Sequence, residues 1–213
     1  EHVPSIYEDL STILASSSAS ARAKACNTIG NMSRHSDFFY QHFARTPRLI
    51  PLLIQLCSDH DPACRKFASF AVGNSAFHSP LLYNELTPAI PPLIRLLSDD
   101  DEKTRANAAG ALGNLVRNSV DLCRVMIENK ALEALLRLVQ MRIPSSSGAR
   151  DALLADSSVK IALFSLGNMS VHAPCKATLH AISASAVCET LVQICPADSQ
   201  VHKYAVRLLQ KLQ

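Results

Sequence analysis

The 213-residue chain has no tryptophan, and aromatic residues make up only 5% of it. Stacked helices bury a continuous core of Leu, Ile, Val and Ala, so such an architecture needs few aromatic side chains. The longest apolar stretch, residues 49–57, is short and is interrupted by Gln55, so the sequence predicts no membrane span. No signal peptide is recognisable either. The composition therefore favours layered helices.

Closely paired cysteines are also missing. None of the seven cysteines belongs to a CxxC pair, and the eight histidines supply no paired ligands, so we expect no metal site. Cys26, Cys57 and Cys123 fall at apolar helical positions. The pattern predicts a reduced, cytoplasmic protein that uses cysteine as a small core residue.

The signatures of several enzyme classes are absent from the chain. It has no glycine-rich phosphate loop, no Walker motif, no Gly-x-Ser-x-Gly and no paired catalytic carboxylates. We therefore expect a non-catalytic chain without a cofactor. The net charge of +3 is small and the basic residues form no dense run, which argues against nucleic-acid binding.

What the chain does contain is one short phrase, Gly-Asn, repeated four times. Four of its six glycines directly precede an asparagine, and the asparagines are spaced by 43, 40 and 54 residues. A period of roughly 40 residues is typical of a helical solenoid rather than of a compact enzyme fold. The four asparagines are Asn31, Asn74, Asn114 and Asn168.

Each Gly-Asn phrase ends a longer unit. About 24 residues earlier, an apolar stripe begins at helical spacing, as in Ile50, Leu53, Ile54 and Cys57. Ser and Asp residues, as in segments 58–62 and 98–102, would cap the next helix. Shorter segments, such as residues 37–45, open most units, so each unit contains three helices. The sequence predicts an all-α, right-handed armadillo (ARM) superhelical solenoid of about five repeats: 1–35 (partial), 36–78, 79–118, 119–172 and 173–213, within a single domain 1–213.

One region breaks the period. The fourth repeat carries about 12 extra residues within segment 140–158, and residues 143–148 are a loop by composition. This insertion is either a tolerated surface loop or a regulated arm whose serines accept phosphate. The first repeat has no short opening helix, and no polar repeat closes the last helix. We therefore expect the chain to be a fragment of a longer protein.

The glycines and asparagines call for separate explanations. Gly in a helix interior costs about 0.8–1 kcal/mol relative to Ala, so we expect each glycine to allow close approach of a neighbouring helix. Each asparagine either bonds a carbonyl or loop of the adjacent repeat, or presents its amide to an extended peptide backbone. The phenylalanines one turn earlier either seat a partner's apolar side chains or belong to the core. The histidines one turn later either sense pH and bind acidic groups, or cap the helix. The candidate partner-binding residues are Asn31, Asn74, Asn114, Asn168, Phe70, Phe164, Arg117, His35 and His78.

The repeats resemble the armadillo family along the whole chain, and segment 108–116 looks like that family's third-helix consensus. In armadillo proteins of the catenin and importin type, the equivalent asparagine holds an extended peptide by its backbone. The importin group also places a tryptophan one turn before the asparagine, where this chain has Asn27, Phe70, Gly110 and Phe164. The resemblance therefore implies a peptide groove, but not recognition of lysine-rich import signals.

Segments 22–35, 65–74, 103–119 and 160–168 are similar, in the same order, to the C-terminal region of Fused-type serine/threonine kinases. This resemblance implies a kinase domain elsewhere in the full protein, because the kinase motifs are absent here. It also implies a role in Hedgehog signalling, the motile cilium or cytokinesis. The partners it implies are kinesin-like, signalling or ciliary proteins, and the location it implies is the cytoskeleton or the cilium.

Three hypotheses follow for the function. The first is a binding module that holds a partner segment along the asparagines. The second is a structural module that docks on its own kinase domain or self-associates through its ends. The third is an electrostatic docking surface for acidic tails, formed by Arg22, Arg65, Arg105 and Lys203 near the starts of the third helices.

Overall fold

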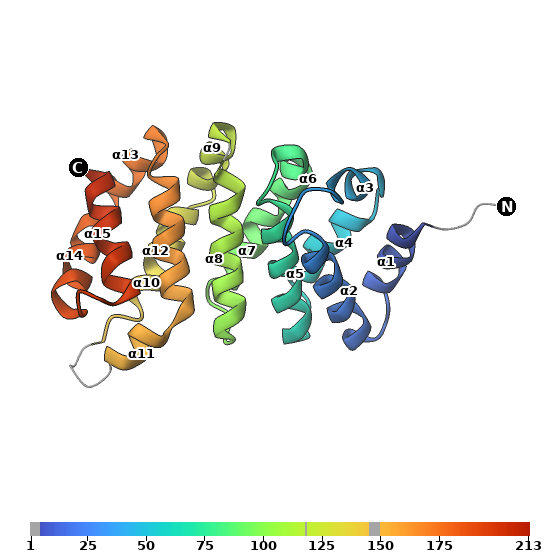
Figure 1. The fold of residues 1–213 in the computed structure, drawn as a ribbon, viewed down its shortest axis with the longest axis horizontal. Helices are drawn as coiled ribbons and strands as arrows, with labels where there is room; N and C mark the ends of the chain where they lie inside the picture. The colour runs from blue at the N-terminus through green and yellow to red at the C-terminus, as the bar shows by residue number, and fades with distance from the viewer. Residues whose placement is uncertain (1–4, 118, 145–149) are drawn as a thin grey trace.

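The computed structural model describes residues 5–117, 119–144 and 150–213, and every regular element within these ranges is helical. The helices stack side by side along one long axis, with the two ends of the chain at opposite ends of the stack (Figure 1). Within the described ranges, no helix is long and apolar enough to cross a membrane. The chain is thus a solenoid of helical repeats, as the period of the Gly-Asn phrase predicts.

The N-terminal half contains the most regular units. The predicted first repeat holds α1 (Ile6–Leu14) and α2 (Ala19–Met32). The predicted repeat 36–78 holds three helices, and the short helix of the next one is split into 3-10 and α turns. In order, these elements are α3 (Tyr40–Arg45), α4 (Leu49–Leu56), α5 (Pro62–Ser75), η1 (Pro80–Leu82), α6 (Tyr83–Leu86), η2 (Thr87–Ala89), α7 (Ile90–Leu96) and α8 (Glu102–Val116).

The C-terminal half contains one additional helix. Residues 150–155 of the predicted loop 140–158 form this helix, which buries Leu153, and the following helix already begins at Ser157. Ser145, Ser146 and Ser147, the predicted phosphate acceptors, lie outside the described residues. The elements of this half are α9 (Val120–Glu128), α10 (Ala131–Gln140), α11 (Arg150–Ala155), α12 (Ser157–Met169), α13 (Ala173–Ala181), α14 (Ala184–Ile194) and α15 (Gln200–Leu212).

Acidic side chains start the long helices, as the repeated joints predict. The carboxylate of Asp61 accepts a hydrogen bond from the backbone N–H of Cys64 at 2.9 Å, and Asp101 accepts one from Thr104 at 2.8 Å. Pro62 occupies the first turn of α5, where its missing N–H is not needed. These caps satisfy N–H groups that a helix start leaves free, so they fix where each long helix begins.

The core lies between two layers of helices. Helices α2, α5, α8, α12 and α15, which we call the third helices, pack against one another in chain order. Helices α4, α7, α10 and α14 cover one side of this layer, with α1 beside α2. The predicted stripes of α4, α7 and α10 point into the core. In the first unit, the corresponding apolar stripe that the sequence predicts is Ile6, Leu10 and Ile13. It is wrong in part, because Leu10 is buried while Ile6 and Ile13 are exposed at the end of the stack.

All seven cysteines are free and buried, which agrees with their predicted use as small core residues. Burial raises the pKa of Cys57, Cys175 and Cys188 to about 12, so these thiols are neutral at pH 7. A neutral, enclosed thiol is a poor nucleophile. The cysteines therefore contribute packing rather than chemistry.

Candidate functional site

The four asparagines lie on the side of the third-helix layer that faces away from α4, α7, α10 and α14. We call this side the ladder face. At the two N-terminal junctions, an asparagine bonds back to the preceding third helix. Nδ2 of Asn74 donates to the carbonyl oxygen of Gly30 at 2.8 Å, and Nδ2 of Asn114 donates to that of Gly73 at 2.9 Å. Both side chains are half-buried. The repeat-bridging role considered for the asparagines is therefore present at these two positions.

The amide oxygens of Asn74 and Asn114 have a different environment. Within the described part of the chain, no donor reaches either Oδ1 atom, and neither atom is buried without a partner. Each amide is thus fixed by its nitrogen and presents its oxygen to solvent. An amide with one hydrogen and its oxygen free can still pair with a polypeptide backbone.

The remaining two asparagines make no such bridge. Asn31 belongs to the first third helix and is exposed, and Asn168 is half-buried. Among the described residues, no hydrogen-bond partner faces either side-chain amide. At the fifth repeat, Lys211 stands where an asparagine would, and its Nζ donates to the carbonyl oxygen of Gly167. A lysine thus replaces the asparagine bridge at the last junction.

Close helix contact explains the first two glycines. A Cβ added to Gly30 would lie 3.2 Å from the Cα of Ala71, and one added to Gly73 would lie 3.3 Å from the Cβ of Ala111. Both distances are tighter than ordinary van der Waals contact. The close-approach explanation is confirmed at these junctions; Gly73 faces the small Ala111, whereas the Cβ added to Gly30 would also lie 2.5 Å from the ring of Phe70.

The last two glycines differ from each other. A Cβ on Gly113 would lie 2.8 Å from the Cβ of Ser165, so this glycine is also required by contact. A Cβ on Gly167 would meet nothing within 4 Å, so the prediction is wrong there. The physical reason lies in α15, where the buried Leu208 occupies the position that Ala71, Ala111 and Ser165 occupy on the earlier helices. A larger side chain there holds α15 farther away.

The histidines one turn after the asparagines also bond backward. Nε2 of His78 lies 3.0 Å from the carbonyl oxygen of Arg34, and Nε2 of His172 lies 2.9 Å from that of Val116. Val116 is the last residue of α8, and Arg34 lies two residues beyond the end of α2. The capping explanation thus describes these two side chains, while His35 is exposed. Asn118, the fourth residue at this register, lies outside the described residues.

Aromatic and basic side chains flank the asparagines. The guanidinium of Arg117 lies 4.6 Å from the ring centroid of Phe77. Phe164 is 37% exposed, stacks at an angle on Tyr204 at 5.6 Å and lies under Arg207. A cation over an aromatic face is attracted by the ring quadrupole. Phe164 is therefore a surface residue of the ladder face rather than a core residue.

A hollow of about 480 Å³ lies across α2, α5 and α8 on the ladder face. Sequence reasoning missed Asn107 here, although it stands two helical turns before Asn114 on the same face. Its Nδ2 donates to the carbonyl oxygen of Lys66 at 3.0 Å. The residues that line the hollow are Asn27, Asn31, Arg34, Lys66, Phe67, Phe70, Lys103, Ala106, Asn107 and Ser157.

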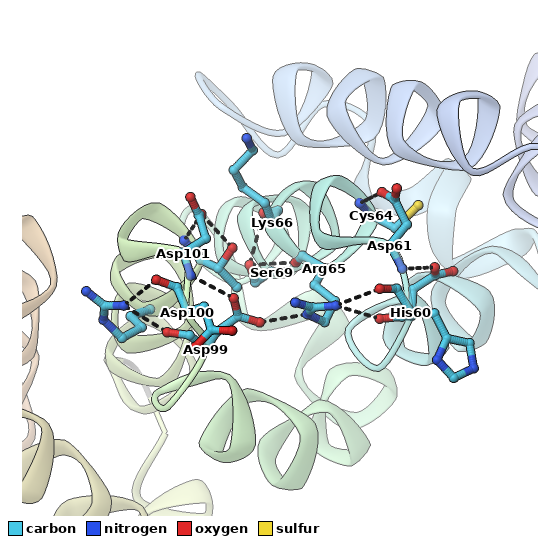
Figure 2. A network of polar contacts seen from close by, with 12 residues as sticks. His60, Asp61, Cys64, Arg65, Lys66, Ser69, Asp99, Asp100 and Asp101 are labelled. Carbon is cyan, nitrogen blue, oxygen red and sulfur yellow. Dashed lines mark hydrogen bonds and ion pairs between the residues drawn. The ribbon is translucent and has the colours of Figure 1, made fainter.

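A second repeated network lies at the N-terminal ends of the third helices. Nε of Arg65 donates to Oδ2 of Asp99 at 2.6 Å, while Nη1 donates to the carbonyl oxygens of Asp59 and His60. Figure 2 shows Arg65 lying between Asp99 and the loop of His60. One arginine thereby ties its own helix start to the loops of two repeats.

The same arrangement recurs at the neighbouring junctions. Arg22 makes a two-bonded pair with Asp59 at 2.9 Å, and Arg105 is buried beside Asp156 at 3.6 Å. Burial alone would raise the pKa of Asp59, but the hydrogen bonds from Arg22 and the backbone N–H of Asp61, together with the positive charge of Arg22, outweigh it and the pKa lies below its usual value. These three arginines serve the solenoid, so the predicted docking surface built on them is not available to acidic tails.

Comparisons with known proteins agree with this fold. The HEAT-like repeat family matches residues 62–115. A designed armadillo repeat protein, solved in complex with the peptide (KR)4, is 23% identical with a TM-score of 0.81; the match covers 96% of this chain and 80% of that one. The armadillo repeats only protein of Plasmodium falciparum is 15% identical with a TM-score of 0.70, covering 91% and 80%. The chain therefore has the fold of an armadillo solenoid.

One curated relative shares sequence as well. Serine/threonine-protein kinase 36 of Mus musculus is 33% identical over 84 residues. The match covers 39% of this chain and only 6% of that kinase. The chain thus corresponds to a small part of that protein, and the similarity involves one stretch of the repeats rather than all of them.

Proposed function

We propose that this chain is a non-catalytic scaffold whose ladder face holds an extended segment of a partner protein. The observation that carries the proposal is that the asparagine amides of Asn74 and Asn114 use their nitrogen but not their oxygen in hydrogen bonds within the chain. Asn74 and Asn114 are oriented by a bond through Nδ2, and Oδ1 remains open to solvent. Side chains held in place before binding lose little freedom when a ligand arrives, so a fixed amide is a favourable anchor.

The polypeptide backbone is the ligand chemistry that suits such a row. An extended segment presents N–H and C=O groups at regular intervals, and each open Oδ1 accepts from one N–H. Asn168 has its whole amide available and accepts and donates together. Binding through the backbone tolerates many side chains, so neighbouring residues such as Phe70 and Phe164 would supply the selectivity.

Two similarities support this proposal. The designed armadillo protein that shares this fold was solved with a peptide bound. The 33% identity to mouse serine/threonine-protein kinase 36 supports the finer proposal, namely a C-terminal docking region of a Fused-type kinase. Under this proposal, the segment comes from a kinesin-like, signalling or ciliary protein. The place of action would be the cytoplasm, at the cytoskeleton or cilium.

A random library of unstructured octapeptides, selected on the wild-type chain, tests the proposal directly. Selected peptides would then be titrated by fluorescence polarisation against wild type and Asn168→Ala. Because Asn168 bonds nothing among the described residues, this variant keeps its melting temperature, and we expect about tenfold weaker binding. Peptides N-methylated at alternate residues lose the backbone donors and should bind more weakly still.

Arg48→Ala, an exposed position on the α3–α4 side, is the matched control and should retain wild-type affinity. Selected peptides that bind Asn168→Ala and the N-methylated forms as tightly as wild type would overturn the proposal. Failure to select any peptide would count against it as well.

A further inference from the structure

Charge is distributed unequally between the third helices and the rest of the chain. The whole chain has 21 basic and 18 acidic residues. The five third helices together contain ten basic residues but a single acidic one, Glu102. The remaining segments are therefore net acidic. The ten basic residues are Arg22, Lys24, Arg65, Lys66, Lys103, Arg105, Lys160, Lys203, Arg207 and Lys211.

Only part of this positive charge is neutralised inside the solenoid. The three arginines at the helix starts are paired with carboxylates, as described above. Within the described residues, no carboxylate lies in ion-pair distance of any lysine of the third helices. Glu102 accepts hydrogen bonds from the N–H and hydroxyl of Ser157 and leaves these lysines unpaired. The ladder face thus retains an unbalanced positive charge.

Three of the lysines without an ion pair recur at one position of the third helices. Lys66 and Lys160 each stand eight residues before an asparagine, and Lys203 stands eight residues before Lys211. Lys203 is exposed, while Lys66 and Lys160 are half-buried. The same position holds Ala23 before Asn31 and Ala106 before Asn114, so these cations accompany α5, α12 and α15 rather than every repeat. We call Lys66, Lys160 and Lys203 the lysine row. Repetition along the groove turns separate weak attractions into a graded preference for one type of segment.

The hollow between α2, α5 and α8 concentrates this charge. Arg34, Lys66 and Lys103 approach it from three different helices or their ends, and none of the described residues that line it is acidic, although Glu102 bonds the lining residue Ser157. Asn27 and Asn107 add amide groups, and the ring of Phe70 closes one wall. A concave site lined by one sign of charge raises the local concentration of counter-ions. A carboxylate would find both cations and hydrogen-bond donors there.

We infer that the segment bound on the ladder face is acidic, with Asp or Glu side chains beside the lysine row and one carboxylate in the hollow. This inference rests on the proposed function and specifies its ligand. A peptide such as (KR)4, which the designed armadillo protein binds, would be repelled here. The cations concerned are the lysines that have no ion pair, together with Arg34, and not the paired arginines at the helix starts.

Three fluorescein-labelled octapeptides test the inference: (Asp-Glu)4, (Ser-Asn)4 and (Lys-Arg)4. We expect measurable binding of the acidic peptide, at least tenfold weaker binding of the neutral one, and none of the basic one. Raising the salt concentration from about 0.05 M to about 0.5 M should weaken binding of the acidic peptide, because added salt shortens the Debye length and screens exposed charges. Equal affinity for all three peptides would overturn the inference.

A pair of variants separates the lysines of the hollow from net charge alone. Lys66→Glu with Lys103→Glu should weaken the acidic peptide by about tenfold or more. Arg48→Glu with Arg124→Glu changes the net charge equally, at two exposed positions away from the ladder face, and should keep affinity within about twofold. Equal loss in both pairs would show mere attraction to a basic protein and would also overturn the inference.

The two proposals fail in different ways. If the library-selected peptides lose affinity for Asn168→Ala but keep it for Lys66→Glu with Lys103→Glu, the proposal of an acidic ligand is wrong and the proposal of a peptide-binding scaffold stands. If the acidic peptide depends on the lysines but binds equally well when N-methylated, the ladder is wrong and the charged surface stands.

Discussion

Helices α5 and α8 are joined to their preceding neighbours differently from helices α12 and α15. In the first region, each junction combines a glycine in close contact with an asparagine that bonds the same glycine's carbonyl. At the junction of α8 with α12, the glycine remains in contact, but Asn168 makes no bond and Ser165 bonds the carbonyl of Ala109 instead. At the junction of α12 with α15, contact at the glycine is lost and Lys211 spans the wider gap.

The comparison shows that one sequence phrase serves two separable purposes. The glycine sets how closely two helices approach, and the residue after it determines which group bridges them. On the next third helix, the residue three positions before its asparagine or lysine decides whether the glycine is needed. Ala or Ser at that position allows close contact, and Leu208 prevents it. The asparagine is consequently most available to a ligand where it is least used by the fold.

The largest expected effect comes from filling the glycine positions. Gly113→Ala would gain about 1 kcal/mol of helix propensity but would force α12 away from α8, so we expect a net loss of about 2 kcal/mol. Gly167→Ala meets open space and should stabilise the chain by up to about 1 kcal/mol. Urea unfolding followed by circular dichroism measures both values. A similar loss in both variants would contradict the difference between the two regions.

A smaller effect is expected from the asparagines. Asn114→Ala removes a bridge worth about 1 kcal/mol, whereas the higher helix propensity of alanine returns roughly half of that. Asn168→Ala removes no bond among the described residues and should be neutral or slightly stabilising. The difference between the two unfolding free energies isolates the bridge. If Asn168→Ala is as destabilising as Asn114→Ala, the amide of Asn168 has a structural partner after all.

The smallest effect concerns the ion pairs at the helix starts, since partly solvated pairs contribute little. Burial would raise the pKa of Asp59 and Asp156, but hydrogen bonds and nearby arginines lower both below the usual value. A carboxylate with a lowered pKa in the folded state stabilises above about pH 4, and this contribution is lost as the pH falls through the folded pKa. Thermal melts from pH 7 to pH 3 should therefore show falling stability.

Two matched variants test whether this pH dependence differs between the N-terminal and the C-terminal junctions. Asp59→Asn should flatten the acid limb of the melting curve more than Asp156→Asn does. Asp59 makes two bonds of 2.9 Å to Arg22, while Asp156 lies 3.6 Å from Arg105 and 3.3 Å from Arg142. Equal flattening by both would mean that the pairing geometry does not control the titration.

The fold could be predicted because its signals are periodic. The Gly-Asn phrase, the apolar stripes and the Asp caps recur at fixed intervals, and each has a direct physical meaning along a helix. The alternative roles of the asparagines could not be separated in the same way. Whether Asn74 reaches Gly30 depends on the distance between two helices, which local periodicity does not determine.

Some misses had a signal in the sequence. Leu208 in place of a small residue indicates the wider last junction, and Asn107 lies at helical spacing from Asn114. The roles of Arg22 and Arg65 were harder to see, because their partners Asp59 and Asp99 are on loops of the next repeat. Helix α11 was missed because its short apolar run lies next to a segment that is a loop by composition.

Every bridge described between third helices through Asn74, Asn114, Lys211, His78 and His172 runs in one direction, from a later side chain to an earlier carbonyl. During synthesis, each acceptor thus leaves the ribosome before its donor and is already part of a finished helix when the donor emerges. The array has a polarity of assembly. A newly made repeat finds the carbonyl acceptors of these bridges already in place, whereas the pairs of Arg22 with Asp59 and of Arg65 with Asp99 form only when the loop of the following repeat arrives.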